Sequence, residues 1–196
     1  MTKLDQAFNL FDEYNQKDPT KIIKNGKEYA SEVFYAQELH DWIVKLDPKA
    51  SEALLLASKC QHIGRWEIER NTYPDGRVGY LTWRSDLSKF HAEKAGEILR
   101  SVGYNEGTIE RVKEIVLKKK LRTDPEVQTM ENALCLVFLE FQYDDLMEQL
   151  SEEKMINILR KTWAKMTEPG KEVALALKYS DKGASILDQA LNNQDA

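Results

Sequence analysis

Apolar residues along most of this chain recur at intervals of three and four positions, which is the period of an amphipathic α-helix. The spacing predicts helices over residues 2–14, 29–46, 50–63, 85–101, 106–119, 125–149 and 151–166, followed by two short C-terminal helices. We find no convincing alternation of apolar and polar residues that would indicate a β-strand. The pattern therefore predicts an all-α fold with negligible sheet.

Several helix boundaries are marked by local signals. Asp124-Pro125-Glu126 is typical of a helix start, because Asp can cap the first turn and Pro fits its fixed φ. Gly103 follows the helix predicted over 85–101 and can adopt the left-handed C-cap conformation. The helix over 50–63 is apolar on nearly every side, so we expect it at the centre of the core.

Three segments depart from the helical pattern. Residues 15–27 are predicted to form a polar loop around Asn25-Gly26, and residues 65–84 form the longest irregular stretch. Within that stretch, Asp75 to Gly79 is typical of a turn. The final residues, 192–196, are polar, and we expect them to be frayed.

Composition narrows the class of protein. The chain has 196 residues and a net charge of −5, with a mean hydropathy of −0.57. This acidic balance disfavours nucleic acid as a partner, and no apolar run approaches the roughly 20 residues that span a membrane. The N-terminus lacks the long apolar core of a signal peptide.

Cys60 and Cys135 lie in apolar runs without paired spacing, which predicts reduced core residues of a cytoplasmic protein. The sequence contains no signal for an oligomeric state.

Four predicted helices each carry one polar residue inside an apolar stripe. Glu32 precedes Ala36, Leu39 and Ile43 at helical spacing, and the corresponding residues of the other helices are His62, His91 and Glu131. Two histidines and two carboxylates can together bind a divalent transition metal in a helical interior. His40 lies on the flank of its helix. We therefore expect it either at the surface or in contact with the metal-binding side chains, without binding the metal itself.

Each of these residues also has a structural interpretation. Glu32 can lie exposed in the first turn of its helix, where a carboxylate is favoured. His62 and His91 can be core histidines satisfied by a hydrogen bond. Glu131 can form a buried ion pair with Lys94, which lies in the same stripe as His91.

Arginine and aromatic residues alternate over 65–84. The guanidinium group binds phosphate or carboxylate through a planar fork, and the aromatic faces can stack on a ligand. The sequence therefore predicts an anion-binding or nucleotide-binding site formed by Arg65, Arg70, Arg77, Arg84, Lys94, Trp66 and Tyr73. The alternative is a loop whose arginines pair with the acids of the same segment, which are Glu67, Glu69 and Asp75.

Part of the chain resembles the HD-domain phosphohydrolases. The resemblance is carried by Leu56–Arg65, by His91–Leu99 and by Met130–Leu134, in the order and helical context of that superfamily. It implies a single all-α domain over 1–196, with an HD-like core of about 29–150 and C-terminal helices over about 151–193.

The metal-binding signature of that superfamily is altered in this chain. Gln61-His62 stands where the superfamily has a His-Asp pair, and Glu131 or Asn132 stands near its final aspartate. His91 matches the superfamily pattern unchanged. The resemblance implies a metal-dependent, hydrolase-like enzyme acting on a phosphorylated or other anionic small molecule, with a divalent cofactor of unspecified identity. The alternative is a metal-free descendant that binds or regulates without catalysis.

A second resemblance covers nearly the whole chain. The segments 61–63, 65–68, 73–74, 90–93 and 135–140 are similar to motifs of an uncharacterised family of short all-α proteins known as a domain of unknown function. This resemblance implies a fold but no activity.

Overall fold

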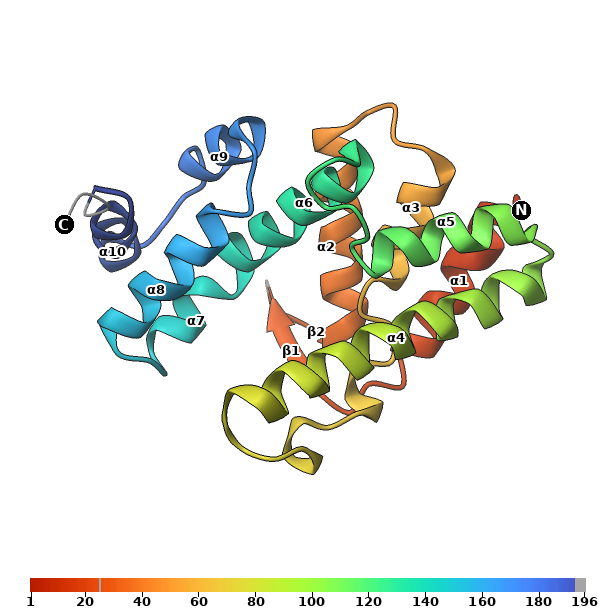
Figure 1. The fold of residues 1–196 in the computed structure, drawn as a ribbon, viewed down its shortest axis with the longest axis horizontal. Coiled ribbons are helices and arrows are strands. Elements are labelled where there is room, and N and C mark those ends of the chain that lie inside the picture. The colour runs from red at the N-terminus through yellow and green to blue at the C-terminus, as the bar shows by residue number, and fades with distance from the viewer. Residues whose placement is uncertain (25, 193–196) are drawn as a thin grey trace. The chain divides into compact units, whose positions relative to one another are not determined.

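The computed structural model describes residues 1–24 and 26–192 and consists mainly of helices (Figure 1). In chain order its principal elements are α1 (Lys3–Asn15), β1 (Lys21–Lys24), β2 (Lys27–Ala30), α2 (Ser31–Leu46), α3 (Glu52–Cys60), α4 (Gly76–Val102), α5 (Glu106–Val116), α6 (Pro125–Phe141), α7 (Tyr143–Met147), α8 (Glu152–Trp163), α9 (Glu168–Leu175) and α10 (Asp181–Asn192). The predicted all-α class is confirmed. The residues at 193–196, whose fraying the sequence predicted, lie outside the described part.

The chain divides into two compact units, residues 1–127 and 128–196, and the boundary between them falls within α6. In the first unit α3 packs against α1, α2, α4 and α5. Leu54, Leu56 and Ala57 of α3 are fully buried, which confirms the predicted central helix. The sequence-based description of one domain with a core ending near residue 150 stays a prediction.

The loop predicted over 15–27 is wrong in its second half, because β1 and β2 form an antiparallel hairpin there. Strands of four residues are too short to show a convincing alternation, and their side chains are mostly exposed or half-buried. The buried Asp18 holds the hairpin against α2: its Oδ1 accepts from the Thr20 N–H at 2.8 Å and its Oδ2 from the Glu32 N–H at 3.0 Å. Residue 25 of the predicted Asn25-Gly26 turn lies outside the described residues.

The second correction concerns α4, which begins at Gly76 and not near residue 85. The turn predicted from Asp75 to Gly79 is therefore the first turn of a 27-residue helix. Gly79 is required there, because a Cβ at this position would lie 1.9 Å from the Pro74 carbonyl oxygen. Trp83 then donates from Nε1 to the Ile68 carbonyl at 2.8 Å, which packs the preceding segment onto the helix. At its other end α4 stops at Gly103 with φ of +87°, as predicted.

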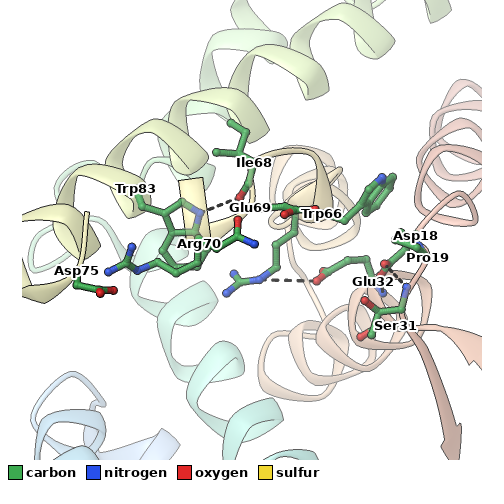
Figure 2. Close-up of a pocket in the computed structure, with 13 residues that line it drawn as sticks. Asp18, Pro19, Ser31, Glu32, Trp66, Ile68, Glu69, Arg70, Asp75 and Trp83 are labelled. Atoms are coloured by element: carbon green, nitrogen blue, oxygen red, sulfur yellow. Dashed lines mark hydrogen bonds and ion pairs between the residues drawn. The ribbon is translucent and has the colours of Figure 1, made fainter. Parts of the chain in front are cut away.

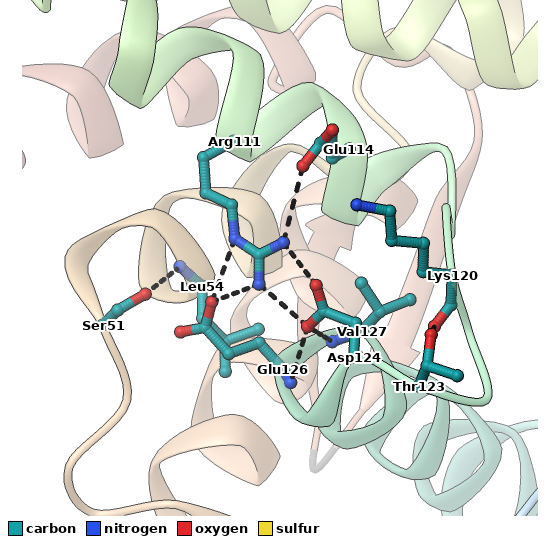
Figure 3. A network of polar contacts seen from close by, with 9 residues as sticks. All are labelled: Ser51, Leu54, Arg111, Glu114, Lys120, Thr123, Asp124, Glu126 and Val127. Atoms are coloured by element: carbon teal, nitrogen blue, oxygen red, sulfur yellow. Dashed lines mark hydrogen bonds and ion pairs between the residues drawn. The ribbon is translucent and has the colours of Figure 1, made fainter.

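Arg111 of α5 connects that helix to the start of α6 (Figure 3). Its guanidinium contacts Asp124 at 2.5 Å and Glu126 at 2.6 Å, with further bonds to both carboxylates. Asp124 also accepts from the Val127 N–H at 3.3 Å, so the predicted helix start at Asp124-Pro125 is confirmed. The helix predicted over 125–149 ends at residue 141 and is followed by the separate α7.

The second unit has its own polar contacts. Asn132 donates from Nδ2 to the Thr167 hydroxyl at 2.7 Å, and the fully buried Tyr143 donates from its hydroxyl to the Gly183 carbonyl at 2.9 Å. The buried Glu131 lies 3.5 Å from Lys165, so the ion pair that the sequence assigned to Lys94 has a different cation. Across the described residues, no helix combines the length and apolar character needed to cross a bilayer.

Candidate functional site

The first unit contains an open cleft of about 750 Å³ (Figure 2). Its walls come from the segment before β1, the start of α2, the connection between α3 and α4, and one residue of α4. The lining residues are Asp18, Pro19, Thr20, Ser31, Glu32, Arg65, Trp66, Ile68, Glu69, Arg70, Asn71, Asp75 and Trp83. The cleft therefore gathers segments that are distant in the sequence.

The connection between α3 and α4 is shaped by a tight turn. Gly64 has φ of +66°, and a Cβ there would lie 2.8 Å from Phe90 and 2.9 Å from Tyr14. A non-glycine residue would meet both backbone strain and a steric clash. This turn leads directly into a short 3-10 helix over Arg65–Glu67, which carries Arg65 and Trp66 to the cleft.

Two arginines from this connection line the cleft. Arg70 donates to the carbonyl oxygens of Tyr73 at 2.9 Å and Pro74 at 3.0 Å, and these bonds fix its guanidinium at one end. The Arg65 side chain is 42% exposed, and its guanidinium lies 5.3 Å from the centre of the Trp83 ring. The ring face favours a cation and limits its motion. Both arginines thus present oriented N–H donors to the cleft.

Glu32 lies in the wall of the cleft opposite these arginines. Its Oε1 is 4.0 Å from Arg65 Nε, which is an ion-pair contact and too long for a hydrogen bond. Burial raises the pKa of Glu32 to about 7, the charge of Asp18 acts in the same direction, and Arg65 opposes both. Near neutral pH the carboxyl is therefore divided between its acid and base forms, which is the state required of an acid–base group.

The two predicted histidines lie next to each other behind this wall. Their ring centroids are 5.8 Å apart. His91 shares a 2.7 Å hydrogen bond between Nδ1 and the Ile63 carbonyl, so Nδ1 is the protonated nitrogen. Burial lowers the pKa of His91 to about 4 and holds the pKa of His62 well below its ordinary value. Both rings are therefore neutral at physiological pH.

The four residues predicted as metal ligands do not form a metal centre in the described structure. Glu131 belongs to the second unit and contacts Lys165. Within residues 1–24 and 26–192, no three His, Cys, Asp or Glu side chains converge as ligands would. Structural zinc sites use four protein ligands and catalytic ones usually three. The described donor set does not fit a metal, and we assign no chemical step to one.

The predicted anion-binding residues divide into two groups. Arg65, Arg70 and Trp66 line the cleft, whereas the remaining four, Arg77, Arg84, Lys94 and Tyr73, are not among its lining residues. Arg77, Arg84 and Lys94 belong to α4, of which only Trp83 lines the cleft, and Tyr73 lies in the connection before that helix; their role in anion binding stays a prediction.

Several of these residues have other contacts in the described structure. The Tyr73 hydroxyl donates to Asp86 at 3.2 Å, and Lys94 pairs with Glu97 at 2.5 Å. The Arg84 guanidinium lies 5.8 Å from the centre of the Tyr80 ring. His40, expected at the surface or behind the ligands, is half-buried, with its Nδ1 3.0 Å from the Ser58 hydroxyl.

Sequence reasoning missed two residues that lie beside Glu32 in the wall of the cleft, Asp18 and Ser31. Asp18 and Ser31 line it because the unexpected hairpin folds residues 18–20 back onto the start of α2. The only local signal is the Asp18-Pro19 pair, which is typical of a turn and not of a site. The paired positions of Asp18 and Glu32 follow from tertiary structure.

The comparisons with known proteins identify a family whose description names no function. Neither a search of curated proteins nor a search of solved structures finds a match to this chain. The resemblance to HD-domain phosphohydrolases therefore stays a prediction. The family model of a domain of unknown function, DUF4202, matches residues 5–187. That match covers nearly the whole chain, and the protein belongs to the DUF4202 family.

Proposed function

We propose that the cleft binds a phosphorylated or otherwise anionic small molecule and that Glu32 exchanges a proton with this ligand. One observation carries the proposal: two oriented arginines share a 750 Å³ cleft with a buried carboxyl whose pKa is about 7. A concave site with a few converging polar groups and a perturbed acid is the usual form of a ligand site.

The charges of the cleft specify how the ligand binds. Arg65 has only a weak partner in Glu32, so its guanidinium can form charge-assisted hydrogen bonds with a phosphate or carboxylate. The half-buried ring of Trp66 offers an apolar face to the rest of the ligand, and a nucleotide base would suit it. Asp18 uses both carboxylate oxygens on backbone N–H groups, so it serves as a support for the wall.

Binding of an anion changes the charge balance at Glu32. In the free protein the positive charge of Arg65 lowers the pKa of Glu32. A ligand anion that forms an ion pair with Arg65 neutralises its positive charge and places negative charge beside the Glu32 carboxyl. Both changes raise the pKa of Glu32. We therefore expect proton uptake at Glu32 on binding, and an affinity that falls as the pH rises through about 7.

Thermal unfolding with a panel of ligands tests the binding. The panel contains inorganic phosphate, a nucleoside monophosphate, a sugar phosphate and a dicarboxylate, each at millimolar concentration. A ligand that binds the folded state raises Tm by mass action. We expect Arg65→Met and Arg70→Met to abolish the rise, and Arg77→Met, from the same stretch of sequence but outside the cleft, to keep it. The absence of any rise in the wild type, or an equal rise in Arg65→Met, would overturn the proposal.

Calorimetry in two buffers of different ionisation enthalpy tests the proton exchange. At pH 7 the wild type should take up a fraction of a proton per bound ligand, and Glu32→Gln should take up none while still binding. Product formation from the bound ligand, lost in Glu32→Gln, would indicate an enzyme. Binding without turnover would identify the metal-free binding module instead.

The metal-dependent form of this function is tested independently of the ligand. His62 and His91 lie next to each other, but two imidazoles are fewer than the three or four protein ligands of zinc sites, so the described structure does not favour this form. Elemental analysis of protein purified without chelator should show a stoichiometric transition metal if this form is correct. Less than about a tenth of an equivalent, with no gain in stability on adding manganese, iron or zinc, would remove it.

A further inference from the structure

A second, much smaller cavity lies behind the cleft wall. Its volume is about 10 Å³, and it is enclosed mainly by α1, α2 and α3. Most of its lining is polar, and the lining residues are Asn15, Glu32, Tyr35, Ala36, Leu39, Ser58, Gln61 and His62. A cavity of about this size holds one water molecule when polar partners surround it. Glu32 lines both this cavity and the cleft, so this residue lies in the wall between the two spaces.

Gln61 supplies the strongest indication of an internal ligand. Its Nε2 donates to the Val116 carbonyl at 3.1 Å, which fixes the orientation of the amide. Its Oε1 is completely buried and accepts no hydrogen bond from any described residue. A buried carbonyl oxygen without a donor is costly, and in folded proteins such atoms usually bind ordered water.

We infer that one water molecule occupies this cavity, donates hydrogen bonds to Gln61 Oε1 and to the Glu32 carboxylate, and stabilises the ionised form of Glu32 from the side opposite the cleft. Gln61 is then a positioning residue, because it orients the water that solvates the carboxylate. The water site does not depend on the proposed function. Its use in proton exchange with a ligand rests on that function.

The charged groups around Glu32 favour a neutral hydrogen-bond donor to its carboxylate on the cavity side. Arg65 lies on the cleft side of Glu32, and Asp18 contributes negative charge at the same helix start. His62 cannot supply a positive charge within the cavity, because burial and neighbouring cations hold its pKa well below the ordinary value. The basic groups that act on His62 are Arg65, His91, Lys118 and Arg84. A water molecule carries no charge and can donate to the Glu32 carboxylate whenever that group is ionised.

NMR of the ligand-free protein tests the inference. We expect cross-peaks between a long-lived water and amide protons at the cavity, together with a Glu32 carboxyl titration midpoint near pH 7. Ala36→Val places two methyl groups against the cavity and should displace the water. The cross-peaks should then vanish, and the Glu32 midpoint should rise by about one pH unit, because the carboxylate loses its donor.

Ala53→Val on α3 is the matched control, since residue 53 does not line the cavity, and it should leave both signals unchanged. Gln61→Leu should reproduce the effect of Ala36→Val. If the Gln61→Leu variant fails to fold because it loses the hydrogen bond to Val116, the Ala36→Val variant alone tests the inference. Absent cross-peaks in the wild type, or an unchanged midpoint in a folded Ala36→Val variant, would overturn the inference. Because no ligand is present, these outcomes are independent of whether the cleft binds an anion.

Discussion

Two of the arginine–carboxylate groups in the first unit, those of Arg111 and Arg65, differ in almost every physical respect. Arg111 contacts Asp124 and Glu126 at hydrogen-bond distances, and this pairing lowers the pKa of Asp124 to about 2. Arg65 approaches Glu32 only to 4.0 Å, and burial raises the pKa of Glu32 to about 7. The same kinds of side chain therefore form short hydrogen bonds around Arg111, a group that we call the clamp, and only a long ion-pair contact between Arg65 and Glu32.

The difference separates structural from functional chemistry. In the clamp, the folded state stabilises the charged carboxylate through short bonds to a guanidinium, which fastens α5 to the start of α6. In the cleft, the folded state disfavours the charged carboxyl, and its arginine keeps donors for another partner. An acid whose pKa rises through burial beside an accessible cation is typical of a functional site.

The largest expected effect is a difference in how stability depends on pH. The folded pKa of Glu32 is raised to about 7 from its ordinary value of 4.5, so the folded state favours its protonated form. The free energy of unfolding should fall as the pH rises from about 4.5 to 7, by on the order of 3 kcal/mol. Glu32→Gln should remove this fall, as measured by urea unfolding at pH 5 and pH 8.

Asp124→Asn serves as the contrasting variant. The folded pKa of Asp124 is depressed, so its contribution is present above pH 4 and disappears as the pH falls toward 2. Asp124→Asn should leave the change between pH 5 and pH 8 intact. If Glu32→Gln keeps the full wild-type change, the contrast between the two carboxyls is wrong.

The second expected effect concerns the backbone that presents the cleft arginines. Gly64→Ala forces a side chain into positive φ and against Phe90 and Tyr14, and we expect a loss of about 2–3 kcal/mol in unfolding free energy. Gly26→Ala also has positive φ but meets nothing within 4 Å, so its cost should be about 1 kcal/mol. Urea unfolding of both variants measures the difference, and equal losses would show that packing around Gly64 is loose.

The smallest expected effect compares the arginines directly. Arg111→Met leaves two partly buried carboxylates without their cation and should cost about 2 kcal/mol at pH 7. Arg65→Met removes a long contact of a 42% exposed side chain and should cost less than about 0.5 kcal/mol. Similar losses in urea unfolding would contradict the assignment of one arginine to the fold and the other to the ligand.

Helical periodicity in the sequence is sufficient to predict most of this fold. Helices such as α2 and α5 bury one continuous face, so their apolar spacing reflects their structure. The β1–β2 hairpin could not be predicted in this way, because its short strands bury little surface. The start of α4 was hidden by Gly76 and Gly79, residues that are typical of turns; in the structure Gly79 lies within the helix, directly against the Pro74 carbonyl.

The candidate site was only partly predictable for a related reason. Arg65, Arg70 and Trp66 are close in sequence, and their alternation already predicted an anion site. Their partner Glu32 lies 33 positions before Arg65, and nothing local connects the two. Its position in an apolar stripe marked it as unusual, but the reason it faces a cleft is the hairpin that brings Asp18 to the start of α2.

The two cysteines give each unit its own probe of local opening. Cys60 is fully buried in the first unit, Cys135 is 5% exposed in the second, and both carry a reduced thiol. A thiol reagent can modify such a residue only when the surrounding structure opens transiently. Labelling rates of the two cysteines therefore report the opening free energy of each unit without any added tag. A ligand that slows modification of Cys60 alone would bind in the first unit.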